Sequence, residues 1–204
     1  MLDPTVRPER PLTNVLRVAA TAGVRLFQYR DKQGTMKDVY RQALSLRQVA
    51  TEVGATLIIN DRCDLALAVK ADGVHLGQED LPLADARRLL GPDAIIGLST
   101  HNPEQVRAAA ALQPDYIGFG PIFGTTTKAD HDPVVGLEGL CTARGLTTLP
   151  MFAIGGITSQ HVSDILTAGA DGVAVISAIL KAADLEEAIR TFLHPPSTPA
   201  RPTH

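Results

Sequence analysis

Short apolar runs recur along the chain, and amphipathic stretches separate them. Seven runs rich in Val, Ile and Leu are typical of strands buried on both faces: VRLFQ (24–28), TLIIN (56–60), GVHLG (73–77), AIIGLS (94–99), DYIGFG (115–120), MFAIGG (151–156) and GVAVIS (172–177). The Ala- and Leu-rich stretches between them, such as 36–53, 83–90, 103–112 and 158–168, are typical of helices. Similar short sequences before the runs, KADGV and TAGADGV among them, indicate one repeated unit. Alternation of this kind predicts a parallel sheet.

The predicted architecture is a (β/α)8 TIM barrel, and a doubly wound open sheet is the alternative. The barrel is favoured because polar residues follow almost every strand, but a closed barrel uses about eight strands. The shortfall lies at the N-terminus, where a helix over 11–22 precedes the first clear run and MLD (1–3) supplies at most the tail of a strand. We therefore expect a missing or truncated first strand and a longer natural start. The two exposed sheet edges would need cover from a helix or a second copy of the chain, so a homo-oligomer is left open.

Length and composition indicate one globular domain. The 204 residues fit a single (β/α)8-type catalytic domain over 1–194, and the Pro-rich segment 195–204 is expected to be a disordered tail. The net charge of −3 offers no basic field for nucleic acid. No apolar run is long enough for a bilayer, and the two cysteines form no CxxC pair. These features predict a cytoplasmic protein that acts on small molecules.

Two cations follow the first run. If the strand continues, Gln28, Arg30 and Lys32 share one face, and like charges on one face repel unless an anion lies between them. Asp61 and Asp80 follow the next two strands, where small numbers of hard oxygen ligands suit Mg²⁺. Taken singly, Asp61 fits helix capping and Asp80 fits a turn. Together with Arg30, Lys32 and Lys128, they instead predict a site for a diphosphate with Mg²⁺.

A second anion site is predicted where the last two strands turn into helices. IGG followed by ITSQ, and VIS followed by AIL, place the backbone N–H groups of Gly155, Gly156, Ile176 and Ser177 there. Barrels commonly bind a phosphate group at this place, although each Gly pair alone would also fit a tight turn. The long loop over 120–139 is expected to be a lid that excludes water. His75 is expected to be a core histidine with satisfied hydrogen bonds, and we assign no catalytic role to His101 or His131.

Several segments resemble the thiamine-phosphate synthase family: QYRDK, INDRCDLALAVKADGVHLGQEDLP, GLSTHNPEQ, DYIGFGPIFGTTTK, AIGGIT and ADGVAVISAI. The resemblance covers the chain from Ala22 to Ala183 in order. The family is a (β/α)8 transferase that couples hydroxymethylpyrimidine diphosphate to a thiazole phosphate or carboxythiazole phosphate, giving thiamine phosphate and diphosphate. The resemblance implies that the pyrimidine diphosphate is held by Gln28, Arg30, Lys32, Asn60 and Lys128, with Ser99 near the pyrimidine. It further implies Mg²⁺ at Asp61 and Asp80, the thiazole at Thr125 and Thr127, and the thiazole phosphate at Gly156, Ile176 and Ser177.

The implied mechanism is dissociative. Mg²⁺, Arg30, Lys32 and Lys128 would stabilise the departing diphosphate, so the protein positions and neutralises and needs no general base. Two alternatives remain open. One is a thiazole phosphate tautomerase of the same fold, which has no diphosphate to bind and would not need the cations and the two carboxylates. The other is a non-catalytic module that binds the phosphate ligands.

Overall fold

The computed structural model describes residues 1–125 and 133–195, and within them the strands form one seven-stranded parallel sheet. Its strands are β1 (Leu26–Tyr29), β2 (Thr56–Asn60), β3 (Gly73–Leu76), β4 (Ile95–Thr100), β5 (Tyr116–Phe119), β6 (Met151–Ile154) and β7 (Gly172–Ala174). The strands pair in sequence order from β1 to β7. Each of the seven apolar runs thus overlaps one strand, and the parallel sheet is confirmed.

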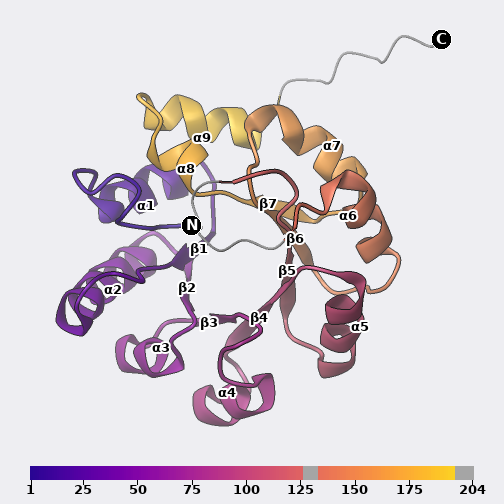
Figure 1. The fold of residues 1–204 in the computed structure, drawn as a ribbon. Helices are drawn as coiled ribbons and strands as arrows, with labels where there is room; N and C mark the ends of the chain where they lie inside the picture. The colour runs from indigo at the N-terminus through magenta and orange to yellow at the C-terminus, as the bar shows by residue number, and fades with distance from the viewer. Residues whose placement is uncertain (126–132, 196–204) are drawn as a thin grey trace.

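Helices surround the strands on the outside of the curled sheet (Figure 1). They are α1 (Leu12–Thr21), α2 (Met36–Glu52), α3 (Cys63–Val69), α4 (Leu83–Leu90), α5 (Pro103–Leu112), α6 (Gly136–Arg144), the short 3-10 helix η1 (Ser159–His161), α7 (Val162–Thr167), α8 (Ser177–Leu180) and α9 (Leu185–Leu193). Side-chain oxygens of Thr35, Asn102 and Asp184 accept from backbone N–H groups at the starts of α2, α5 and α9. The predicted barrel architecture is confirmed.

The segment before α1 contains no full strand within the described residues, as the sequence predicts. Leu2 forms a single parallel bridge to Tyr29, with its N–H donating to the Gln28 carbonyl (2.7 Å) and its carbonyl accepting from the Arg30 N–H (2.9 Å). The nitrogen of Met1 donates to the carbonyl of Val175, just after β7 (2.8 Å). Met1 and Leu2 therefore contact both edges of the sheet.

Three aspartates at the amino ends of the strands repeat one arrangement. Asp72, directly before β3, accepts from the N–H of Leu57 in β2 (2.7 Å) and pairs with Arg47 of α2 (2.5 Å). Asp115, directly before β5, accepts from the N–H of Ile96 in β4 and pairs with Arg87 of α4, both at 2.7 Å. Asp171, directly before β7, accepts from the N–H of Met151 in β6 (2.8 Å) and pairs with Arg144 of α6 (3.2 Å). Each carboxylate thus joins two strands and one helix, which explains the repeated ADGV-like sequences.

Rings and glycines alternate inside the barrel. His75, Gly97 and Tyr116 stand at paired positions on β3, β4 and β5. A Cβ at Gly97 would lie 2.2 Å from the Tyr116 ring and 2.6 Å from His75 Nδ1, so a larger residue would displace both rings. Tyr116 also packs edge-on against Phe152 of β6, with ring centroids 5.5 Å apart. These rings pack against one another inside the barrel.

Candidate active site

A cavity of about 1130 Å³ opens at the carboxyl ends of the strands. It is lined by most of the residues that the sequence predicts for the site: Arg30, Lys32, Asn60, Asp61, Asp80, Ser99, Thr125, Gly156, Ile176 and Ser177. Gln28 is half-buried in β1 and, among the described residues, is not one of those lining the cavity. Thr127 and Lys128 lie outside the described residues, as does the middle of the expected lid. The predicted residues that are described therefore meet in one cavity, except Gln28.

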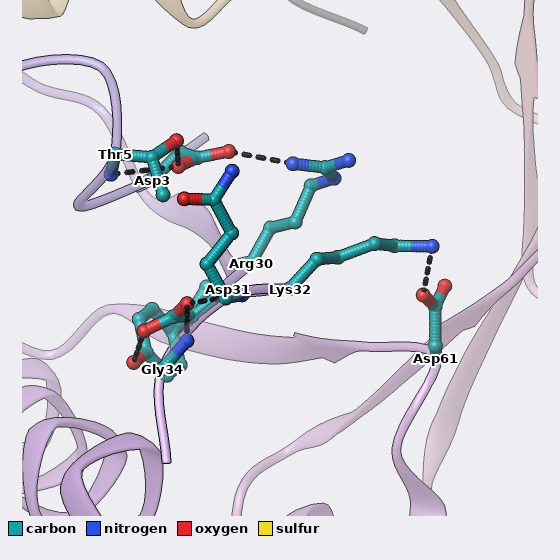
Figure 2. A network of polar contacts seen from close by, with 9 residues as sticks. Asp3, Thr5, Arg30, Asp31, Lys32, Gly34 and Asp61 are labelled. Atoms are coloured by element: carbon teal, nitrogen blue, oxygen red, sulfur yellow. Dashed lines mark hydrogen bonds and ion pairs between the residues drawn. The ribbon is translucent and has the colours of Figure 1, made fainter. Parts of the chain in front are cut away.

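Arg30 and Lys32 reach the cavity from the loop after β1, because the strand ends at Tyr29 and not at Lys32. Asp31 holds this loop in shape by accepting from the N–H groups of Gln33 (3.0 Å) and Gly34 (2.8 Å). Figure 2 shows the two cations extending in different directions, Arg30 toward Asp3 and Lys32 toward Asp61. The expected repulsion is thus relieved partly by a separate carboxylate for each cation.

Asp61 and Asp80 converge beside Lys32. The Lys32 ammonium lies 2.8 Å from Asp61 Oδ2, and Asp80 accepts from the N–H of Gly77 at 2.6 Å. Burial raises the pKa of Asp80, and its hydrogen bond with the Asp61 side chain and the negative charge of Asp61 raise it further, against the Gly77 N–H and the Lys32 charge. Asp61 has φ +60°, a left-handed conformation that a non-glycine residue rarely adopts. Two carboxylates are therefore held close together at the cost of mutual repulsion and backbone strain.

This pair of carboxylates fits a hard divalent cation. The described residues contain no cluster of three or more His, Cys, Asp or Glu able to hold a metal. Mg²⁺ is commonly bound in this way, by one or two carboxylates together with water and substrate phosphates. A cation here would also offset the repulsion that raises the pKa of Asp80. The donor set fits Mg²⁺ shared with a diphosphate.

Glycines form another part of the cavity wall. Gly155 (φ +97°) and Gly156 (φ +60°) follow β6 in left-handed conformations, and a Cβ on Gly156 would lie 2.3 Å from the carbonyl oxygen of Gly124. Ile176 and Ser177, after β7 and at the start of α8, line the same cavity. The absence of side chains at 155 and 156 lets a ligand approach the backbone closely, which suits a phosphate group.

His75 links the barrel interior to the cavity. Its Nδ1 lies 3.0 Å from the hydroxyl of Tyr116, and its Nε2 lies 2.9 Å from the hydroxyl of Ser99, which lines the cavity. Tyr116 is buried, and that burial raises the pKa of its phenol well above the usual range. His75 is thus a buried histidine with hydrogen-bond partners, as expected, but it also holds a residue of the site.

Some cavity residues were missed by the sequence analysis. Thr5, His101, Gln105 and Lys181 line the cavity, and Asp3 lies directly behind Arg30. His101 Nδ1 lies 2.6 Å from the Gly120 carbonyl, and the His101 N–H donates to Gln105 (2.7 Å). Asp3 and Thr5 were not assigned to the site because the segment before the first clear strand supplied at most the tail of a strand in MLD (1–3). The proximity of Asp3 to Arg30 depends on the bridge between Leu2 and β1.

These features define a class of protein before any comparison. A parallel α/β barrel with cations, paired carboxylates and a glycine-lined wall at the carboxyl ends of its strands has the organisation of barrel enzymes that act on phosphorylated small molecules. Residues 2–179 match the family model described as Thiamine monophosphate synthase. The chain belongs to this family.

Individual relatives agree with the family match. The chain is 45% identical over 176 residues to thiamine-phosphate synthase of Chloroflexus aurantiacus, covering 86% of this chain and 81% of the relative. It is also 45% identical over 184 residues to thiamine-phosphate synthase of Syntrophomonas wolfei, covering 90% and 88%. A solved structure of thiamine phosphate pyrophosphorylase from Pyrococcus furiosus matches with a TM-score of 0.83 and 36% identity, covering 94% of this chain and 91% of that chain.

Proposed function

We propose that this chain is a thiamine-phosphate synthase, which joins the pyrimidine methylene carbon of hydroxymethylpyrimidine diphosphate to the ring nitrogen of a thiazole phosphate. The carbon–oxygen bond to diphosphate breaks with its electron pair leaving on diphosphate. The thiazole nitrogen then supplies the pair for the new carbon–nitrogen bond. The products are thiamine phosphate and diphosphate, and no proton has to be removed.

One observation carries this proposal within the family. Arg30, Lys32, Asp61 and Asp80 meet in the same cavity as the glycine-lined wall at 155–156. A tautomerase acting on the thiazole phosphate alone would have one phosphate to bind and no departing diphosphate to neutralise. Cations beside a carboxylate pair favour the coupling reaction over that alternative.

The protein's contribution to the reaction is electrostatic and positional. Arg30 and Lys32 would face the diphosphate as negative charge collects on it, which lowers the barrier for its departure. The aminopyrimidine is electron-rich and can carry the positive charge left on its methylene carbon, so the pathway is dissociative. Ser99 would orient the pyrimidine ring, and the backbone at 156 and 176–177 would hold the thiazole phosphate so that its nitrogen faces that carbon. Thr125, together with Thr127 from outside the described residues, would line the thiazole.

Mg²⁺ is the cofactor that we propose, with Asp61 and Asp80 as its protein ligands. When bound, it would supply positive charge to the diphosphate oxygens in addition to that of Arg30 and Lys32. Lys128, named on the sequence resemblance, would add a third protein cation. Asn60 lines the cavity next to Asp61 and would donate its amide to the pyrimidine diphosphate.

The surroundings of the reaction follow from the substrates. Among the described residues, no helix combines the length and the apolar character needed to cross a bilayer. We place the chain in the cytoplasm, acting on the two small phosphorylated substrates and not on nucleic acid. Whether it acts as a homo-oligomer does not affect the cavity residues named above, since all of them come from one chain.

The test is direct coupling. Purified protein is incubated with hydroxymethylpyrimidine diphosphate, thiazole phosphate and Mg²⁺, and thiamine phosphate and diphosphate are measured together. We expect both products in equal amounts. Isomerisation of a thiazole phosphate without diphosphate release would support the tautomerase alternative, and tight binding of both ligands without turnover would support the binding module.

A further inference from the structure

We propose that Asp3 is a positioning residue for the coupling reaction, because it holds the Arg30 guanidinium in the orientation that the departing diphosphate requires. This inference rests on the proposed function and extends it to a residue outside the predicted site. Asp3 itself need not touch the substrate. It would act through Arg30, so its effect should disappear when Arg30 is absent.

The contact between the two side chains is close and shielded from water. Arg30 Nη1 donates to Asp3 Oδ2 at 2.7 Å, and the side chain of Asp3 is 1% exposed while that of Arg30 is 14% exposed. The other carboxylate oxygen, Oδ1, accepts from the N–H of Thr5 (3.0 Å) and from its hydroxyl (2.6 Å). Figure 2 shows Asp3 and Thr5 on one side of Arg30, away from Lys32 and Asp61. Asp3 is therefore fixed by Thr5 and can in turn fix Arg30.

The backbone strengthens this arrangement. The Arg30 N–H donates to the carbonyl of Leu2, the residue immediately before Asp3, at 2.9 Å. Arg30 is thus held at both its backbone and its guanidinium by two consecutive residues. A guanidinium is planar and carries five N–H donors in a fixed arrangement, so one short contact at Nη1 fixes the direction of the remaining donors. Those donors belong to a side chain that lines the cavity.

A buried carboxylate next to a substrate-binding arginine has opposite effects on binding and on rate. Its negative charge weakens the attraction of the Arg30 region for a diphosphate, so it does not favour ground-state binding. The fixed orientation favours the transition state, in which charge grows on the departing oxygen. Removing the charge of Asp3 should therefore lower kcat without raising the KM for the pyrimidine diphosphate. A purely structural role would not predict this separation.

The experiment is a double-mutant cycle on the full chain with Asp3→Asn, Arg30→Ala and the combined variant. For Asp3→Asn we expect kcat to fall about 10- to 100-fold, with the KM for the pyrimidine diphosphate unchanged or lower and the KM for the thiazole phosphate unchanged. In the Arg30→Ala background, adding Asp3→Asn should have almost no further effect on kcat. Glu52→Gln, which breaks the surface pair with Arg17, is the matched control and should leave both constants unchanged.

The possible outcomes separate the two proposals. If the unaltered protein does not couple the substrates, the proposed function fails. If it couples them but Asp3→Asn has no effect, or lowers kcat by the same factor with and without Arg30, the positioning role of Asp3 is refuted while the function stands. Circular dichroism melts will show whether Asp3→Asn is folded at the assay temperature. If it is not, Thr5→Val keeps the carboxylate and removes its 2.6 Å hydroxyl bond, and the same cycle with Arg30→Ala decides the question.

Discussion

The Tyr116 hydroxyl and His75 Nδ1 lie 3.0 Å apart, and His75 Nε2 lies 2.9 Å from the Ser99 hydroxyl, so the three side chains form one chain of polar contacts. Burial raises the pKa of Tyr116, so the phenol keeps its proton, and we expect it to donate that proton to Nδ1. In that tautomer His75 would carry its proton on Nε2 and donate to the Ser99 oxygen, 2.9 Å away. The hydroxyl hydrogen of Ser99 would then be available to an acceptor in the cavity, such as a ring nitrogen of the pyrimidine.

Tyr116→Phe should weaken recognition of the pyrimidine by removing the donor that fixes the His75 tautomer. We expect the KM for the pyrimidine diphosphate to rise about tenfold, the worth of one hydrogen bond, while the KM for the thiazole phosphate stays the same. Tyr40→Phe is the control, since it removes a tyrosine hydroxyl on the exposed side of α2, and Tyr40 is not one of the described residues that line the cavity. Equal effects from the two variants would contradict the chain from Tyr116 to Ser99.

Arg30→Ala should separate the two halves of the site. The loss of a cation that faces the departing diphosphate should lower the coupling rate by about 10²- to 10³-fold. The affinity for thiazole phosphate should stay nearly unchanged, because its proposed ligands lie after β6 and after β7. We expect the same pattern for Lys128→Ala on the basis of the sequence resemblance. Steady-state kinetics with each substrate varied in turn will measure this, and equal losses for both substrates would show that the division of the cavity is wrong.

Removal of Mg²⁺ should abolish coupling, and Asp80→Asn should raise the Mg²⁺ concentration needed for half-maximal rate by about tenfold or more. The reason is that Asp80 is one of the two carboxylates proposed to bind the ion, and an amide binds a divalent cation less strongly. Asp64→Asn is the control, because Asp64 is a nearby carboxylate in the first turn of α3 that pairs with Arg62. A rate that is the same with EDTA as with Mg²⁺ would contradict the proposed metal site.

The sequence predicted the sheet and most of the cavity, because both depend on local patterns. Apolar runs located all seven strands, and residues after those strands had to meet at one end of a parallel barrel. The alternating pattern of Gln28, Arg30 and Lys32 predicted that the first strand would continue to Lys32. In the structure β1 ends at Tyr29, and Arg30 and Lys32 lie in the loop after it. Asp3 was missed for a different reason. Its contact with Arg30 joins residues 27 positions apart through a single β-bridge, and no local pattern marks such a bridge.

Asp115→Ala should destabilise the barrel more than the loss of an ordinary surface ion pair. Asp115 pairs with Arg87 and also accepts from the N–H of Ile96, so its removal leaves a backbone donor of β4 without that partner. We expect the free energy of unfolding to fall by about 1–2 kcal/mol, at the modest end for a charged group because the carboxylate is partly exposed. Urea denaturation will measure it. Glu52→Ala removes a surface carboxylate that also pairs with arginine and should have a much smaller effect, whereas equal effects would refute the joining role of Asp115.

Gly156→Ala should damage the proposed thiazole phosphate site because the added Cβ would collide with the cavity wall. Gly54→Ala separates this collision from the effect of backbone strain. Gly156 and Gly54 have nearly the same backbone φ, +60° and +63°. A Cβ at 156 would lie 2.3 Å from the Gly124 carbonyl oxygen, whereas at 54 it would meet nothing within 4 Å. Both variants therefore carry a similar left-handed strain, on the order of 1 kcal/mol, but only the change at 156 has to move the cavity wall. We expect Gly156→Ala to raise the KM for thiazole phosphate about tenfold or more, a shift of the size produced when a binding contact is lost, and Gly54→Ala to leave it unchanged. If the two variants lose stability equally and neither changes that KM, the wall at 155–156 does not bind the thiazole phosphate.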